Sequence, residues 1–210
     1  MKLFIYEHCP FCLRTRMIAG LKNLPIQYEI IMEGDEETAV NLVGKKVVPI
    51  LQKDDGSYLT ESLDIVKYLD QFSEPYFTRG KLNQNIEEWI KTHSETIFKL
   101  IVPRFVDGQF KEIETPEARL AFKTRETKAF GDLEQLKQDS AIYISEMNSA
   151  LADLEHLMLR LSIDITDFIL FPWLRSLTIV KGLEFKPNTL IYMQRIAKQS
   201  KVNLLFDQAQ

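Results

Sequence analysis

The chain is poor in the residues that bind metals and build disulfide frameworks. Among its 210 residues there are only two cysteines, Cys9 and Cys12, and three scattered histidines, His8, His93 and His156. A structural zinc site usually needs four Cys or His ligands, so the second pair of ligands is missing and no metal site is predicted. Two cysteines within one motif also do not make the disulfide framework of a small secreted protein.

Strong positive charge and long apolar runs are lacking as well. The formal net charge is −4, which argues against a nucleic-acid partner, because a phosphate backbone selects for basic surfaces. The longest uncharged apolar runs, such as residues 168–174, are far shorter than the roughly 18–20 residues that cross a bilayer. The N-terminus shows no basic-then-apolar signal segment. We therefore expect a cytoplasmic protein with no membrane and no nucleic-acid partner.

The feature that stands out is a Cys-Pro-Phe-Cys motif between a short apolar strand and a helix. From Leu13 onward, apolar residues return with helical spacing, so Cys9 is predicted at or near the N-cap. Pro10 then takes the first helical position, where its missing N–H costs nothing. Two cysteines at this spacing, without further metal ligands, indicate a thiol–disulfide enzyme. A pair of inert core cysteines is the alternative.

The helix start predicts different roles for the two sulfurs. Unpaired N–H groups and the positive end of the helix dipole favour a thiolate and lower the pKa of Cys9 from about 8.5 into the range of about 3.5–7.5. Arg14 and Arg16 add positive charge one turn further on. Cys12, one turn inside the helix, is expected to be more covered and less ionised, so Cys9 attacks and Cys12 resolves. His8 is interpreted as a solvated turn residue, with a catalytic neighbour that tunes Cys9 as the alternative.

The first 72 residues alternate between strand and helix signals. Their order, βαβα followed by ββα, belongs to the thioredoxin fold, an α/β domain with a mixed four-stranded sheet. Residues 73–83 hold a proline, a glycine and little periodicity, and they are predicted to be a linker. The expected elements are strands at 2–6, 27–31, 48–52 and 57–60, helices at 10–22 and 61–72, and a short helix or turn at 34–42.

After the linker, strand signals vanish, and residues 84–210 are predicted to form an all-helical domain. Apolar residues repeat with gaps of three and four, which we interpret as core-facing stripes. Asp164 and Asp167 resemble a capping box. The expected helices cover 86–101, a segment that begins at Thr115-Pro116, 144–161, 162–182 and 188–199.

A Cys-Pro-x-Cys thioredoxin-like domain followed by a helical domain resembles the glutathione-transferase architecture. Within it, the chain most resembles the larger two-domain bacterial glutaredoxins, the glutaredoxin 2 family, across essentially its whole length. Two departures are visible: Phe11 stands where the family usually has tyrosine, and the stretch before Ser162 is shorter than usual. The matching segments are residues 8–13, 16–18, 20–23, 48–55, 103–105, 170–172 and 203–205.

The resemblance implies that glutathione is the partner thiol and that no tightly bound cofactor is needed. It implies that Val48 pairs its backbone with the cysteine part of glutathione, and that Pro49 follows a cis peptide bond and faces Cys9. It also implies that Glu61 and Ser62 hold the γ-glutamyl group, which agrees with the preference of a carboxylate for a helix N-terminus and a serine hydroxyl. An ordinary helix cap is the alternative for this last pair.

The implied function is a glutathione-dependent thiol–disulfide oxidoreductase that reduces protein–glutathione mixed disulfides and protein disulfides. A glutathione transferase shares the fold but has no role for the second cysteine of the motif. A channel-like or scaffold protein of this fold usually lacks the resolving cysteine. We expect a monomer, because no heptad seam extends beyond one helix. The charges of Arg16 and Lys22 either meet the glycyl carboxylate of glutathione or are solvated.

Overall fold

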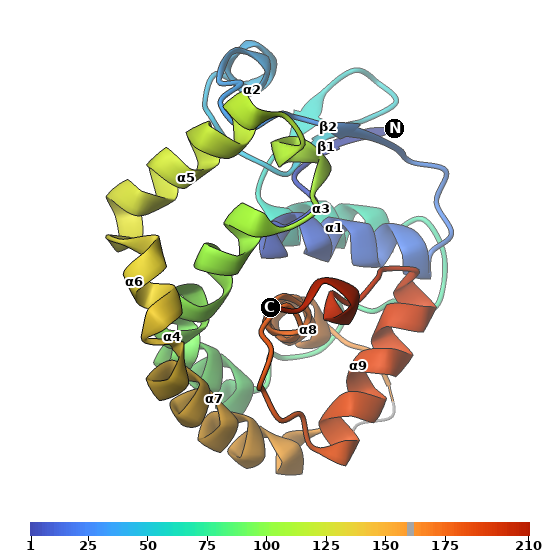
Figure 1. The fold of residues 1–210 in the computed structure, drawn as a ribbon. Coiled ribbons are helices and arrows are strands. Elements are labelled where there is room, and N and C mark those ends of the chain that lie inside the picture. The colour runs from blue at the N-terminus through green and yellow to red at the C-terminus, as the bar shows by residue number, and fades with distance from the viewer. Residues whose placement is uncertain (159–161) are drawn as a thin grey trace.

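The computed structural model describes residues 1–158 and 162–210, which form a sheet-containing part and a helical part (Figure 1). The sheet has four strands in the order β2-β1-β3-β4. β1 is parallel to β2 and antiparallel to β3, which pairs antiparallel with β4. The elements of this part are β1 (Lys2–Ile5), α1 (Pro10–Leu21), β2 (Gln27–Ile30), α2 (Glu37–Val43), β3 (Ile50–Gln52), β4 (Tyr58–Leu59) and α3 (Ser62–Asp70).

The mixed four-stranded sheet and the element order expected from the sequence are confirmed, although the strands are shorter. The strand expected at 48–52 begins only at Ile50. Pro49 stands directly before it and has no N–H to contribute to a strand ladder. The segment expected to be a short helix or turn forms α2, and its C-cap, Gly44, lies in the left-handed region with φ of 76°.

In the helical part, the first residues of the helices agree with the sequence prediction more closely than the last residues do. Thr115 accepts a hydrogen bond from the N–H of Ala118 at 3.2 Å, as a helix cap does, and Asp164 donates its N–H to Asp167 Oδ2 at 2.7 Å. The elements are α4 (Gln84–Asp107), η1 (Lys111–Ile113), α5 (Pro116–Phe130), α6 (Leu133–Gln138), α7 (Ser140–Leu154), η2 (Glu155–Leu157), α8 (Asp167–Leu177), α9 (Pro187–Ser200) and η3 (Phe206–Gln208).

Two predicted helices are therefore shorter than expected. The helix expected at 144–161 ends at Leu154 and is followed by the 3-10 turn η2, while Leu161 lies outside the described residues. The helix expected over 162–182 is confined to α8. An apolar period of 3.6 residues marks a buried face, but it does not say where the chain stops being helical.

Helix α1 lies between the sheet part and the helical part (Figure 1). It contacts α3 on one side and α8 and α9 on the other. At Gly20, an added Cβ would lie only 1.8 Å from the carbonyl oxygen of Ser200, so only glycine allows α1 to approach the end of α9 this closely. One hydrophobic cluster runs through α1 from Leu3 in the sheet to Leu174 in α8, and the two parts share a core.

Charged side chains also join the two parts. Arg125 of α5 forms a fork with Glu33, with Nη1–Oε2 of 2.6 Å and Nη2–Oε1 of 2.9 Å, the geometry of a strong bidentate pair. Arg175 of α8 is 1% exposed and donates to the carbonyl oxygens of Glu7 and Asn203, each at 3.1 Å. Both arginines come from the helical part and bind groups near the start of the chain or near its end.

The linker is attached to the sheet part by Lys22. Its buried ammonium lies 3.0 Å from Asp70 Oδ1 and donates to the carbonyl oxygens of Ser73 and Pro75. Asp70 in turn accepts the N–H groups of Phe77 and Thr78, at 2.8 to 3.0 Å. Both alternatives for Lys22 are therefore wrong, since it neither is solvated nor is free to meet a carboxylate of a ligand.

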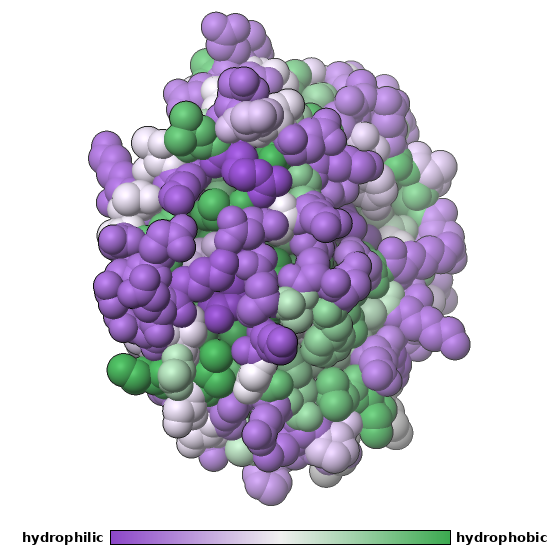
Figure 2. Space-filling view, viewed as in Figure 1, coloured by the Kyte–Doolittle hydropathy of each residue, from purple (hydrophilic) through white to green (hydrophobic). Residues whose placement is uncertain are grey.

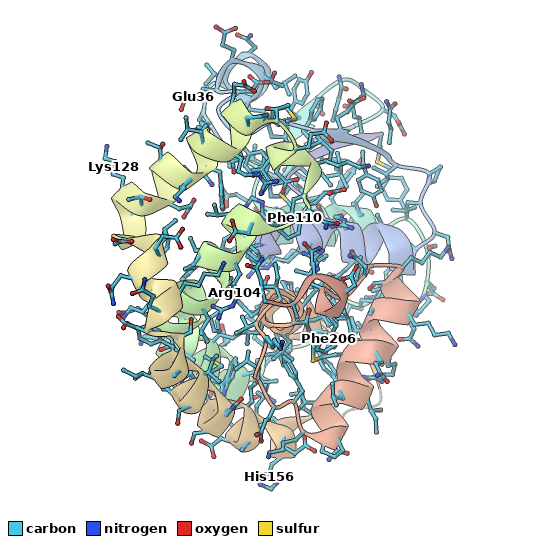
Figure 3. All side chains as sticks on the ribbon, viewed as in Figure 1. Glu36, Arg104, Phe110, Lys128, His156 and Phe206 are labelled. Carbon is cyan, nitrogen blue, oxygen red and sulfur yellow. The ribbon has the colours of Figure 1, made fainter. Side chains whose placement is uncertain are left out.

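The surface offers no single large apolar stripe on the face shown in Figure 2, which is mainly hydrophilic with small separated apolar areas. The most exposed apolar side chains, Ile142, Leu120 and Ile191, come from α7, α5 and α9. Arg104, labelled in Figure 3, lies beside the end of the chain and donates from Nε to the carbonyl oxygen of Gln210 at 2.9 Å. None of the helices described is both long and apolar enough to cross a membrane.

Candidate active site

Cys9 is the N-cap of α1, as the sequence predicts. Its backbone is extended, its Sγ accepts the N–H of Cys12 at 3.5 Å, and Pro10 occupies the first helical position. Cys9 is half-buried, whereas Cys12 is fully buried and its Sγ accepts the N–H of Tyr6 at 3.4 Å. Both cysteines are free thiols. The first sulfur is therefore the accessible one, and the second lies behind it.

The two thiols differ in acidity. The hydrogen bond from the Cys12 thiol lowers the pKa of Cys9 most, burial opposes this, and the charge of His8 and the N–H groups of Cys12 and Phe11 lower it further, to about 7. Burial, followed by the contact with Cys9, raises the pKa of Cys12 well above its ordinary value. At neutral pH, a substantial share of Cys9 is a thiolate while Cys12 keeps its proton.

His8 is a buried residue, which corrects its interpretation as a solvated turn histidine. It is 7% exposed, and its Nδ1 lies 2.5 Å from Oε1 of Glu112, which also accepts the N–H of His8 at 2.9 Å. Burial acts to lower the pKa of His8, but the hydrogen bond and charge of Glu112 outweigh it and raise the pKa above 6.5. Sequence reasoning missed Glu112 because it lies 104 residues from His8 and has no motif around it.

A cleft of about 460 Å³ opens beside Cys9 where the two parts meet. Its walls are mainly apolar, and the charged side chains Lys46, Arg125 and Glu126 stand among them together with His8. A pocket with this composition holds an organic ligand by apolar contact and orients it with few polar groups. The apolar lining includes Tyr6, Phe11 and Val48 from the sheet part and Phe98, Phe105 and Phe122 from the helical part.

Val48 lies on this cleft together with Cys9. Its peptide bond to Pro49 is cis, as the family resemblance implies. Within the part of the chain that the structure describes, neither the N–H nor the C=O of Val48 has a protein hydrogen-bond partner. An extended ligand beside Cys9 thus meets one unused donor and one unused acceptor on the backbone.

Glu61 and Ser62 form the start of α3. Glu61 has φ of 67°, which is unusual for a residue with a side chain and costs about 1–3 kcal/mol, a strain often found at functional sites. Its side chain is exposed, makes no capping bond and lies 3.6 Å from Lys45 Nζ. The buried Ser62 Oγ accepts a hydrogen bond from Arg14 Nη1 at 3.2 Å. Arg14 therefore connects this helix start to α1, two residues beyond Cys12.

The described residues contain no group of three or more His, Cys, Asp or Glu side chains that could hold a metal ion. The sulfur pair, the lowered pKa of Cys9 and the adjacent cleft form a site for exchange between a thiolate and a disulfide. Fold and site together define the class of the protein: a two-domain thiol–disulfide oxidoreductase with a glutathione-transferase-like fold.

Comparison with known proteins identifies the family. The model for the N-terminal domain of glutathione S-transferase matches residues 3–75, and the model for the C-terminal domain of glutaredoxin 2 matches residues 85–209. The chain is 40% identical to Glutaredoxin 2 of Escherichia coli strain K12 over 216 residues, which covers 100% of both proteins. The chain belongs to the glutaredoxin 2 family.

Solved structures agree with this assignment. Glutaredoxin 2 from Salmonella typhimurium, in complex with glutathione, is 38% identical and superposes with a TM-score of 0.96 over 100% of this chain and 98% of that one. A glutathione S-transferase domain-containing protein from Marinobacter aquaeolei VT8 is 15% identical, with a TM-score of 0.58 over 97% and 100% of the two chains. The second likeness shows the shared fold alone. The resemblance stated from the sequence is confirmed.

We expect the alkylation rate of Cys9 by iodoacetamide to rise with pH around a midpoint near 7, because the thiolate is the nucleophile and its fraction grows as the pH passes the pKa. Mass spectrometry after brief exposure identifies the modified sulfur, and Cys12 should react only at much higher pH. Cys9→Ser is the control and should lose the neutral-pH phase. A midpoint near the ordinary value of about 8.5 would contradict the lowered pKa.

Proposed function

We propose that this glutathione-dependent oxidoreductase reduces protein–glutathione mixed disulfides and protein disulfides, with Cys9 as the nucleophile and Cys12 as the resolving thiol. The observation that carries the proposal is the asymmetry of the two sulfurs. Cys9 is half-buried, faces the cleft and has a pKa of about 7, whereas Cys12 is fully buried with a raised pKa. A site built for structural cysteines has no need for this difference.

With a glutathione mixed disulfide, the Cys9 thiolate attacks the glutathione sulfur. The original S–S bond breaks, its electron pair leaves with the protein sulfur, and that thiolate takes a proton from water. Cys9 is now joined to glutathione. A second glutathione thiolate attacks the glutathione sulfur of this intermediate, releases glutathione disulfide and restores the Cys9 thiolate.

With a protein disulfide, Cys9 attacks one sulfur and forms a mixed disulfide with the substrate protein. Cys12 then loses its proton and attacks the Cys9 sulfur, which releases the reduced substrate and leaves a Cys9–Cys12 disulfide. Two glutathione molecules reduce that disulfide in succession. The backbone N–H of Cys12, already 3.5 Å from Cys9 Sγ, supports the close approach that this step needs.

The proposed glutathione site uses residues around the cleft. The unpaired N–H and C=O of Val48 suit the backbone of the glutathione cysteine, with Pro49 completing the turn beside Cys9. Ser62 and the start of α3 suit the γ-glutamyl carboxylate, because helix N–H groups and a hydroxyl both donate to it. Glu61, whose side chain is exposed, suits the α-ammonium. The relative crystallised with glutathione supports binding of the same ligand here.

The role assignment predicts a large difference between two serine variants. Cys9→Ser should lose reduction of a small glutathione mixed disulfide by at least about 100-fold, while Cys12→Ser should keep much of it, because glutathione itself resolves the intermediate. The coupled consumption of NADPH through glutathione reductase measures both rates. Equal losses in the two variants would mean that the roles are wrongly assigned.

The apolar cleft also suits the electrophile of a glutathione transferase, so the same preparation is tested for conjugation of a chlorodinitrobenzene-type compound. Conjugation that survives Cys9→Ser and exceeds disulfide reduction would favour the transferase alternative. We expect the opposite, because an attacking cysteine forms a mixed disulfide with glutathione in place of activating its thiolate.

Removal of the Ser62 hydroxyl should weaken binding of the glutathione moiety. A hydrogen bond to a charged group contributes about 1.5–3 kcal/mol, so Ser62→Ala should raise KM for a glutathione mixed disulfide about tenfold and change kcat little. Ser57→Ala is the matched control, because Ser57 lies in an exposed turn and its hydroxyl donates to Asp55 Oδ1 at 2.6 Å. Equal KM values for the two variants would remove Ser62 from the glutathione site.

We also infer a monomer that acts in the reducing cytoplasm on glutathionylated and disulfide-bonded proteins. The exposed apolar side chains are dispersed over separate helices, and a stable dimer usually buries a contiguous patch. Sedimentation velocity at low micromolar concentration measures the mass in solution. A stable species of twice the chain mass would contradict the inference.

A further inference from the structure

The pair formed by His8 and Glu112 is not explained by any step of thiol–disulfide exchange. Glu112, in the 3-10 turn η1 of the helical part, is 0% exposed, and its Oε1 accepts both the N–H and the Nδ1 proton of His8. Its Oε2 is buried and has no hydrogen-bond partner in the described part of the chain. A buried carboxylate is costly unless a partner compensates its charge, and the His8 ring is placed to do so.

Aromatic rings enclose the imidazole of His8. Tyr6 stacks on it at 5.7 Å and 15°, and Phe105, Phe110 and Phe122 approach it with centroid distances of 5.2, 5.7 and 4.9 Å. Phe110, labelled in Figure 3, comes from the turn that leads into η1. Water is largely excluded by such a shell, so charges within it interact more strongly than at a surface.

Burial disfavours the charged form of both His8 and Glu112, and the contact between them offsets this effect. Burial lowers the pKa of His8 and raises that of Glu112, but each partner outweighs burial for the other, so the pKa of His8 is raised and that of Glu112 is lowered. The protonated form of His8 is thereby favoured one residue before Cys9, on the same cleft. Its charge is one of the causes that lower the pKa of the Cys9 thiol.

Other charged and titratable groups face the pair from the surrounding elements, but none of the described ones hydrogen-bonds to the His8 ring except Glu112. Glu33, after β2, adds a weaker influence that raises the pKa of His8, and its own carboxylate is held by Arg125 of α5. Arg175 of α8 faces Glu112. The remaining groups are Tyr6 and Glu7 after β1, Cys9 and Cys12 of α1, and Lys111 of η1.

We propose that Glu112 is a positioning residue supplied by the helical domain, which acts through His8 to keep the sulfur of Cys9 ready to attack a disulfide. This inference rests on the proposed role of Cys9 as the nucleophile. Glu112 touches neither substrate nor sulfur. Its Oε1 accepts one hydrogen bond from the imidazole and one from the backbone N–H of His8, which orients the ring. The carboxylate also favours the charged form of the ring inside an apolar shell, and that charge stabilises the thiolate. The second domain thus takes part in the chemistry of the first.

The test is Glu112→Gln, which keeps the shape and an acceptor oxygen but removes the charge. Without the carboxylate, the His8 ring should lose its positive charge near neutral pH. The midpoint of Cys9 alkylation should then rise from near 7 by about one pH unit, the size of shift expected when a thiolate loses a nearby positive charge. Disulfide reduction should fall several-fold at pH 7 and return close to the wild-type rate at pH 9, where Cys9 is ionised in both proteins. A purely structural defect would lower the rate equally at both pH values.

Two further variants separate the proposed route from a general effect of charge. Glu33→Gln removes another buried carboxylate and should shift the Cys9 midpoint much less. The backbone N–H of Glu33 donates to the carbonyl oxygen of Glu112 at 2.8 Å, so the two residues are neighbours. In a His8→Gln background, Glu112→Gln should produce no further shift, since its effect passes through the imidazole. An equal shift in both backgrounds would show that Glu112 acts on Cys9 directly and would overturn the proposal.

The wild-type protein gives an independent measurement that does not depend on a variant folding. The chain has three histidines, so NMR titration of the imidazole signals resolves His8 after assignment with His8→Gln. His8 should remain protonated above pH 6.5, and a neutral His8 at pH 6 would overturn the proposal. If Cys9→Ser keeps activity, the proposed function itself fails. If Cys9 is essential but Glu112→Gln leaves the midpoint of Cys9 alkylation unchanged, only the present inference fails.

Discussion

The close packing of helix α1 between the sheet and the helical domain is the constraint on which the rest of the structure depends. A helix enclosed on both sides has only its ends available for chemistry, and its N-terminal end carries Cys9. Gly20 at the other end allows contact with α9 that any side chain would prevent. The reactive sulfur is therefore placed by the same packing that joins the two domains, and the cleft beside it has walls from both.

In this two-domain chain, the helical domain adds groups that the sheet domain alone does not supply. The helical domain supplies aromatic rings that enclose His8 and a carboxylate that binds its imidazole. It also supplies two arginines, which bind the carboxylate of Glu33 and the carbonyl oxygen of Glu7. The electrostatic environment of the thiol is thus assembled from segments that lie far apart in the sequence. Cys9 thus lies at the boundary between the domains, and both domains line the cleft beside it.

The features predicted well from the sequence are those set by neighbouring residues. A cysteine before proline and an apolar helical period place Cys9 at a helix start, and the same local logic identifies the cap at Thr115. The features missed depend on distant partners. The residues around His8 carry no signal for Glu112, and those around Lys22 carry none for its ion pair with Asp70. Helix ends were also misjudged, because the apolar stripe of α7 continues past Leu154 after the helix has given way to η2.

The attachment of the linker by Lys22 has a consequence for the cleft beside Cys9. Because the ammonium binds Asp70 and two carbonyl oxygens of the linker, the one covalent connection between the domains is held along the sheet domain and cannot serve as a loose hinge. The width of the entrance to Cys9 is then a property of the fold. A disulfide that reaches Cys9 therefore meets a cleft whose walls are set by contacts within the fold and not by movement of the linker.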